Sequence, residues 1–100
     1  MACRARSIAL NKRITSSRSA DQILSVYKHD GGDFNSVNLA TAIHRLGRNN
    51  GASHRTDPRL CDSLEQAASS VAHDHRWSPR ELANVCWAAA KMGAATPTLF

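Results

Sequence analysis

Two stretches of this chain have apolar residues spaced for one face of an α-helix. In each stretch the apolar positions follow the i, i+3, i+4, i+7 pattern of an amphipathic helix. The positions are Leu39, Ala42, Ile43 and Leu46 in the first stretch, and Leu82, Val85, Cys86 and Ala89 in the second. The offset of 43 residues between Leu39 and Leu82 lies in the range of two-helix repeats of the HEAT and armadillo kind.

The second stretch also carries the sequence signals of a helix start. Ser78, Pro79 and Glu81 occupy the N-cap, first and third positions of a capping box, in which the two outer side chains bond each other's backbone N–H groups. Asn35 is the corresponding cap of the first stretch. The helices that these signals predict span residues 36–48 and 79–92.

A weaker helical pattern precedes each of these helices. Asp57 and Pro58 form a cap and first turn, and Ser19 and Gln22 form a second capping box further upstream. No segment alternates apolar and polar residues as a strand does. The sequence therefore predicts an all-α fold, which we interpret as an α-solenoid fragment of two helical hairpins. The four predicted helices cover residues 20–29, 36–48, 58–73 and 79–92.

The expected organisation has five parts. Residues 1–18 are a basic N-terminal segment, residues 19–48 and 57–93 are the two helical repeats, and a polar loop joins the repeats over residues 49–56. Residues 94–100 combine a capping residue, a proline and apolar residues, so we expect them to begin a truncated third repeat. The chain has sixteen alanines and only twenty Leu, Ile, Val, Met and Phe residues, which is a small supply of large apolar side chains. This composition favours repeats that bury apolar surface against their neighbours, rather than a domain with a self-sufficient core.

The net charge of +5 comes entirely from the N-terminal segment. The first 20 residues hold five Lys and Arg and no acid, whereas the eight bases and eight acids of the remaining chain cancel. An acid-free, Arg- and Ser-bearing start is compatible with an organelle transit peptide. A disordered basic arm that touches nucleic acid and a plain solvated tail are the competing interpretations. We expect a mitochondrial or chloroplast protein on the first interpretation, and otherwise a cytoplasmic one.

The second helix of each predicted hairpin is more basic than the first. A polyanion would therefore meet these second helices first, although a solvated helix face explains the same charges. The candidate binding residues lie opposite the apolar stripe on these helices. They are Thr41, Arg45 and Arg48 in the first repeat, and Arg80, Asn84 and Lys91 in the second.

Candidate catalytic and metal-binding groups are weak. His73 and His75 are two residues apart at a helix end, so they would not share a face, and no further ligand supports them. Cys61 and Cys86 fall on predicted apolar faces, so we expect small buried core residues. Trp87 could stack on a nucleobase, but its place beside the stripe favours packing between helices. We expect no catalytic residue, metal or cofactor, and no apolar run could span a bilayer.

The segment Ser78–Asn84, followed by Trp87-Ala88, Ala90-Lys91 and Gly93, resembles the repeat helix of octotricopeptide-repeat proteins. It is also similar to the helical repeats of FAST-kinase-like, RAP-domain proteins. Residues 34–46 look like a divergent copy. The resemblance implies an α-solenoid that binds RNA in mitochondria or chloroplasts and acts in transcript processing, stability or translation.

The chain departs from this family pattern at several points. His44 stands in the first repeat where the second has Trp87, and Gly47 lies inside the last turn of its helix. Only two repeats are present, and the C-terminal module of many relatives is absent. The sequence thus predicts a module that binds single-stranded RNA and is not an enzyme. The alternative is an α-solenoid scaffold for protein–protein interaction without RNA binding.

Overall fold

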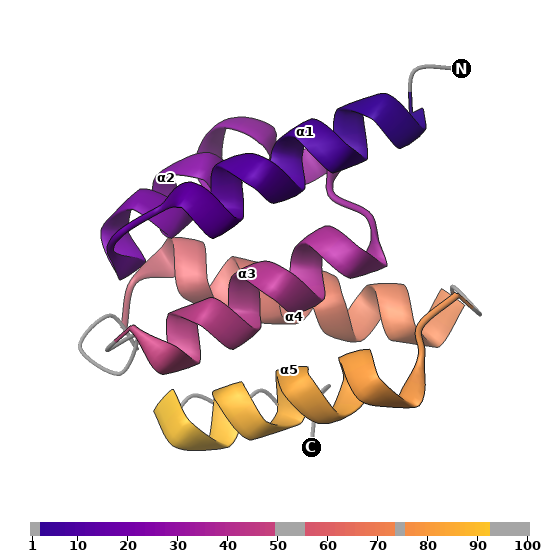
Figure 1. Cartoon of the computed structure of the whole chain (residues 1–100). Helices are drawn as coiled ribbons and strands as arrows, with labels where there is room; N and C mark the ends of the chain where they lie inside the picture. The colour runs from indigo at the N-terminus through magenta and orange to yellow at the C-terminus, as the bar shows by residue number, and fades with distance from the viewer. Residues whose placement is uncertain (1–2, 50–55, 74–75, 93–100) are drawn as a thin grey trace.

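The computed structural model describes residues 3–49, 56–73 and 76–92, and within these ranges the chain is helical with no strand (Figure 1). The four predicted helices are present, and a further helix precedes them. The elements are α1 (Cys3–Ser16), α2 (Ala20–Asp30), a 3₁₀ turn η1 (Gly31–Asp33), α3 (Ser36–Arg48), α4 (Pro58–His73) and α5 (Pro79–Met92). The all-α prediction is confirmed. The expected third repeat, at residues 94–100, lies outside the described residues, as does most of the predicted loop at 49–56.

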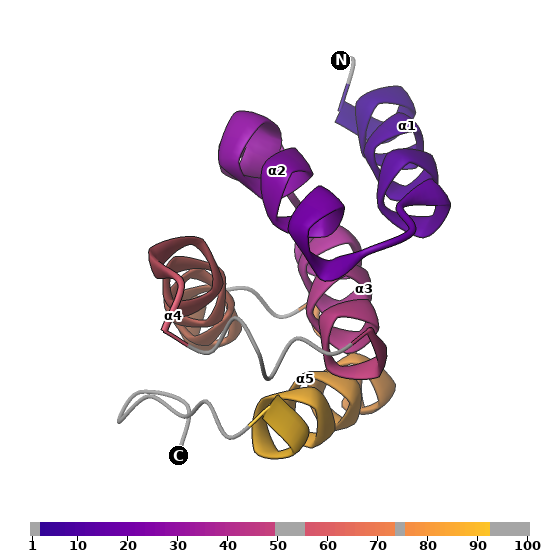
Figure 2. The same ribbon diagram turned by 90° about the vertical axis from the view of Figure 1, so that its left-hand side faces the viewer.

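The helices alternate between two layers. Helices α1, α3 and α5 form one layer, and α2 and α4 form the other (Figure 2). Helix α3 lies between α1 and α5 and makes its most extensive contact with α5, while α2 contacts α4 across the second layer. Corresponding helices of the two predicted hairpins therefore lie side by side. We call the first group the front layer and the second group the rear layer.

Helix starts follow the capping chemistry that the sequence predicts. The Ser78 N–H donates to Glu81 Oε1 at 3.0 Å, and the Glu81 N–H donates to Ser78 Oγ at 3.1 Å. Asn35 and Asn38 form the same reciprocal pair at the start of α3, at 3.1 and 2.9 Å. Asp57 accepts the Arg59 N–H at the start of α4. These bonds fix where α3, α4 and α5 begin.

The apolar stripes of the two repeats meet in one continuous core. Leu39, Ile43 and Val85 are almost fully buried in it, and Leu82 packs against it while remaining partly exposed. Helices α2 and α4 add Ile23, Leu24, Leu60 and Leu64 from the rear layer. The core therefore joins both layers and both repeats.

Helix α1 was not predicted, because the sequence of residues 1–18 indicated a basic segment and no helix. Leu10 and Ile14, four residues apart on one face, are both fully buried against the neighbouring helices. Two apolar positions in a mostly exposed helix are too few for the periodicity to stand out. Arg6 and Arg13 both pair with Asp30 of α2, so part of the N-terminal positive charge is neutralised within the fold.

The predicted burial of two cysteines in the core is wrong. Cys61 and Cys86 are both exposed. On α5 the buried positions are Val85, Ala88 and Ala89, so the buried stripe is rotated away from Cys86. On α4 the buried residues are Leu60, Ser63, Leu64, Ala67 and Ala68, so the buried face includes Ser63 and leaves Cys61 outside.

Gly47 of α3 explains the rotation of α5. A Cβ atom at Gly47 would lie 2.8 Å from the Cβ and 3.0 Å from the Cα of Ala88. Carbon atoms do not approach this closely without strain, so only glycine allows α3 and α5 this near to each other. Ala88 fills the space, and the side of α5 that carries Ala88 becomes the buried side.

Candidate nucleic-acid interface

A groove lies between α3 and the start of α5, with a cavity volume of about 350 Å³. It brings together five of the six residues that the sequence analysis proposed for RNA binding. Those five are Thr41, Arg45, Arg48, Arg80 and Asn84. The remaining lining comes from Thr15, Ala40, His44, Ser78 and Glu81. We call this site the α3–α5 groove.

Helix geometry explains why these side chains converge. Thr41, Arg45 and Arg48 are spaced at steps of four and three residues, so they share one face of α3. Arg80 and Asn84 share the facing side of the first turns of α5, which the Ser78 capping box fixes in place. The close approach at Gly47 sets the distance between the two helices. Two short polar rows thus become the two walls of one groove.

The groove is strongly basic. Three guanidinium groups line it against one carboxylate, that of Glu81, which accepts the Ser78 N–H. Within the described part of the chain, Arg45, Arg48 and Arg80 form no ion pair with a carboxylate. The Nε atom of Arg45 is buried and has no hydrogen-bond partner among these residues. A buried N–H without a protein partner is costly unless water or a ligand accepts from it.

Lys91, the sixth proposed residue, does not line the groove. Its Nζ atom lies 4.9 Å from the ring centroid of Trp87, one turn earlier on α5. Trp87 in turn lies beside His44, with 5.1 Å between the ring centroids and 50° between the ring planes. Because His44 lines the groove, these contacts place Lys91 and Trp87 next to its end. Trp87 touches the neighbouring helix as expected, yet 45% of the residue is exposed.

The protonation of His44 depends on its burial and on the neighbouring arginines. Burial, followed by the nearby Arg48 and Arg45 charges, lowers the pKa of His44 below its ordinary value. The imidazole is therefore neutral near pH 7. It contributes ring surface and a hydrogen-bonding nitrogen to the groove, while the arginines contribute the charge.

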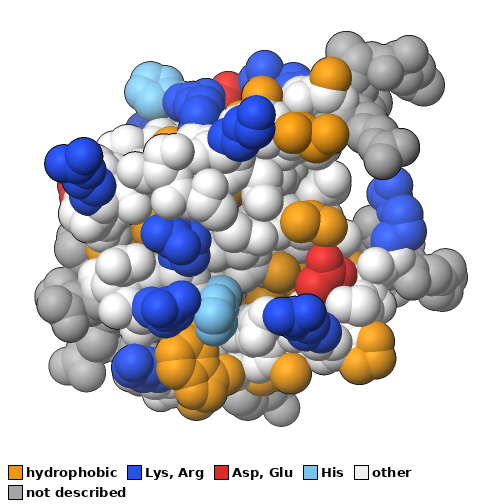
Figure 3. All heavy atoms as spheres, in the orientation of Figure 1, with side chains coloured by type: hydrophobic (Ala, Val, Ile, Leu, Met, Phe, Trp, Pro, Cys, Tyr) orange, Lys and Arg blue, Asp and Glu red, His pale blue; other side chains and the backbone are white. Residues whose placement is uncertain are grey.

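The two layers differ in charge. Helices α1, α3 and α5 carry eight Lys and Arg against one Glu, whereas α2 and α4 carry four Asp and Glu against two Lys and Arg. Figure 3 shows the front-layer face, on which basic side chains gather while acidic ones are sparse. Asp30 of α2 pairs with α1, and other rear-layer polar groups bond within their own layer: Arg59 pairs with Asp21 at 2.9 Å, and Tyr27 donates from its hydroxyl toward Asp62 or Gln66.

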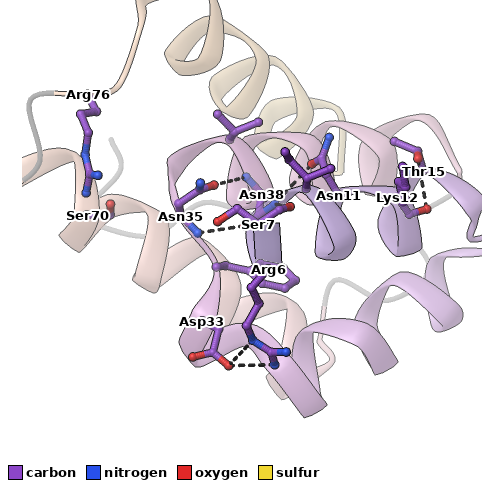
Figure 4. Close-up of a pocket in the computed structure, with 13 residues that line it drawn as sticks. Arg6, Ser7, Asn11, Lys12, Thr15, Asp33, Asn35, Asn38, Ser70 and Arg76 are labelled. Atoms are coloured by element: carbon purple, nitrogen blue, oxygen red, sulfur yellow. Dashed lines mark hydrogen bonds and ion pairs between the residues drawn. The ribbon is translucent and has the colours of Figure 1, made fainter. Parts of the chain in front are cut away.

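A second and larger cavity, of about 760 Å³, lies beside α1 and the start of α3 (Figure 4). Lys12, Asn11 and Thr15 reach it from α1, and Arg76 approaches from the segment before α5. Thr15 lines this cavity and the α3–α5 groove alike, so the two adjoin. The sequence predicts no site here, because its pattern predicts no helix within residues 1–18.

The described residues include no group of three His, Cys, Asp or Glu side chains that could hold a metal ion. None of the helices in this part of the chain has the length and apolar character needed to cross a membrane. Comparison with protein-family models, with curated proteins and with solved structures finds no match to this chain.

Proposed function

We propose that this chain is a helical-repeat module that binds single-stranded RNA in the α3–α5 groove. One observation carries the proposal: residues proposed from two separate helices converge on a single groove with three arginines and one acid. The two-layer stacking of corresponding helices supports the α-solenoid interpretation, in which each repeat adds one unit to a continuous surface.

The proposed roles follow from side-chain chemistry. Arg45, Arg48 and Arg80 hold phosphates, since guanidinium groups form paired, charge-assisted hydrogen bonds with phosphate oxygens. Thr41 and Asn84 offer donors and acceptors to base edges. Repeat proteins of this type read about one base per repeat, so two repeats bind weakly and with little sequence preference.

Charge reversal at the groove tests the proposal. Arg48→Glu with Arg80→Glu should weaken binding of a labelled uridine decanucleotide by roughly tenfold or more, because two phosphate contacts are replaced by repulsion. Both arginines are exposed, so the fold should tolerate the change. Lys28→Glu on the rear layer is the control for one charge reversal at an exposed helix position away from the groove, and it is compared with the single variants Arg48→Glu and Arg80→Glu.

Fluorescence anisotropy at several salt concentrations supplies the measurement. Three phosphate contacts on a single strand predict a slope of log affinity against log salt of about −2. Equal affinities for the wild type and the Arg48→Glu, Arg80→Glu variant would contradict the proposal. Weakening by Lys28→Glu to the same degree would show that overall charge, and not the groove, governs binding.

A protein-interaction scaffold is the second candidate. Ile8 and Val37, which are 52% and 45% exposed, both line the larger cavity beside α1. Exposed apolar side chains in a concave site are typical of protein-binding surfaces. The salt titration separates the candidates, because a mainly apolar interface lacks the steep salt dependence of phosphate contacts.

We propose an organellar location for this module on the basis of the family resemblance alone. In that setting the module acts on a mitochondrial or chloroplast transcript, in its processing, stability or translation. Imaging of the chain with a C-terminal fluorescent tag tests this point separately from RNA binding. An even cytoplasmic signal would remove the organellar role and leave the proposed binding chemistry in place.

A further inference from the structure

The two tryptophans of this chain have opposite environments. Trp77 is buried, at 8% exposure, and its indole N–H donates to Ser70 Oγ at 2.9 Å. Trp87 is 45% exposed, and its indole N–H has no hydrogen-bond partner among the described residues. Packing and hydrogen bonding account for Trp77, whereas much of the Trp87 surface remains open to solvent.

One side of Trp87 nevertheless packs against α3. One edge of its ring lies close to the α3 backbone, since a Cβ atom at Gly47 would be 3.4 Å from Trp87 Cζ3. The His44 ring, with its centroid 5.1 Å away, packs beside it from the same helix. An aromatic side chain held this way presents a ring to solvent with little conformational freedom left to lose on binding.

Cations surround this aromatic pair. Lys91 Nζ lies 4.9 Å from the Trp87 ring centroid, and His44 lines the groove that also contains Arg45 and Arg48. An exposed ring at the end of a basic groove is the arrangement by which single-strand binders stack bases while cations follow the backbone. The Lys91 side chain is exposed, and a lysine stem has several rotatable bonds, so its ammonium can leave the ring for an adjoining phosphate when a base stacks there.

We infer that Trp87, supported by His44, is a stacking platform for one unpaired nucleobase at the end of the α3–α5 groove. This inference rests on the proposed RNA binding and deepens it by assigning the site of the base. Stacking is tolerant of sequence because every base has an aromatic face. The platform therefore adds affinity for a nucleic acid strand over other polyanions without adding a strong base preference.

Abasic oligonucleotides separate stacking from phosphate contact, because they keep the sugar-phosphate charge and lack the bases. We expect the wild type to bind a uridine decanucleotide more tightly than an abasic strand of equal length. Trp87→Ala should weaken uridine binding by roughly 5- to 100-fold. It should leave abasic binding and the salt slope unchanged. Trp87→Phe, which keeps an aromatic face, should retain much of the uridine affinity.

Fluorescence gives a second readout. In a Trp77→Phe background the remaining emission comes from Trp87, and uridine strands should quench it while abasic strands should not. The affinity comparison uses the natural Trp77 and so does not depend on that variant folding. Circular dichroism melting of Trp87→Ala and Trp87→Phe shows whether each is folded before affinities are compared.

The outcomes distinguish this inference from the proposed function. Loss of binding on charge reversal of Arg48 and Arg80, with no effect of Trp87→Ala on uridine affinity, overturns the platform and leaves RNA binding standing. Equal weakening of uridine and abasic binding by Trp87→Ala also overturns it. Absence of binding by the wild type to either strand removes both. Selective loss of uridine binding supports the platform.

Discussion

Gly47 illustrates how one missing side chain sets the geometry of the whole groove. In an ordinary helix interior, replacing glycine by alanine raises stability by about 1 kcal/mol. Here the new Cβ would meet Ala88 at 2.8 Å. We expect Gly47→Ala to lower the free energy of unfolding by about 1–3 kcal/mol, because overpacking outweighs the helix preference. Urea denaturation measures the change.

Gly32 provides the control for this substitution. A Cβ atom there would have nothing within 4 Å, so Gly32→Ala should leave stability nearly unchanged. A gain in stability for Gly47→Ala would show that α3 and α5 separate at little cost. The described groove geometry would then not depend on the glycine.

His44 gives the molecule a pH response at the residue scale. Its pKa is lowered in the folded state, so the unfolded chain takes up the proton first as the pH falls. The free energy of unfolding should therefore decrease as the pH drops through about 6.5 toward 5.5. His44→Gln should flatten this part of the profile. Urea denaturation at pH 7.5, 6.5 and 5.5 measures it, and an unchanged profile in the variant would assign the effect elsewhere.

At the scale of elements, α1 is an integral part of the core. Leu10 is fully buried against α3 and its neighbours, whereas Ile8 on the same helix is 52% exposed. Leu10→Ala should cost about 2–5 kcal/mol through the cavity it leaves. Ile8→Ala should change stability far less. Thermal and urea unfolding of the two variants test this contrast, and equal stabilities would mean that α1 is not docked in solution.

The strength of local signals decided which elements could be predicted. Helices α3 and α5 were predicted with their ends because an N-cap residue and a four-position apolar stripe occur together in each, with a full capping box at the start of α5. Helix α1 has only two fully buried apolar positions and no comparable capping signal, so its sequence pattern is weak. Its packing against α3 becomes visible only in the tertiary structure. The prediction that Cys86 is buried was wrong, because the orientation of α5 depends on its contact with Gly47 of α3, which lies outside the α5 sequence.

For the candidate site, the solvent-facing residues could be predicted from the sequence, but their arrangement in space could not. Residues opposite an apolar stripe must face solvent, which is why Thr41, Arg45 and Asn84 could be proposed from spacing alone. Their convergence on one groove depends on how α3 and α5 cross, and no local pattern specifies that. The contribution of Thr15 and the cavity beside α1 required the tertiary fold.

At the scale of the whole molecule, the two adjoining cavities define a path across the front layer. Lys12 lines the cavity beside α1, beyond the α3–α5 groove. If one strand follows this path, Lys12→Glu should weaken binding of a uridine dodecanucleotide severalfold while leaving a tetranucleotide in the α3–α5 groove nearly unaffected. Anisotropy with both lengths measures the difference, and equal effects on the two would confine the strand to a single groove.

The unequal charge of the two layers gives the molecule a basic side and a weakly acidic side. In the field of a polyanion the cationic side turns toward the ligand, so diffusional encounters become productive from one direction. For the proposed RNA ligand, the consequence is an approach orientation favoured before contact, and this preference fades as added electrolyte shortens the range of the field.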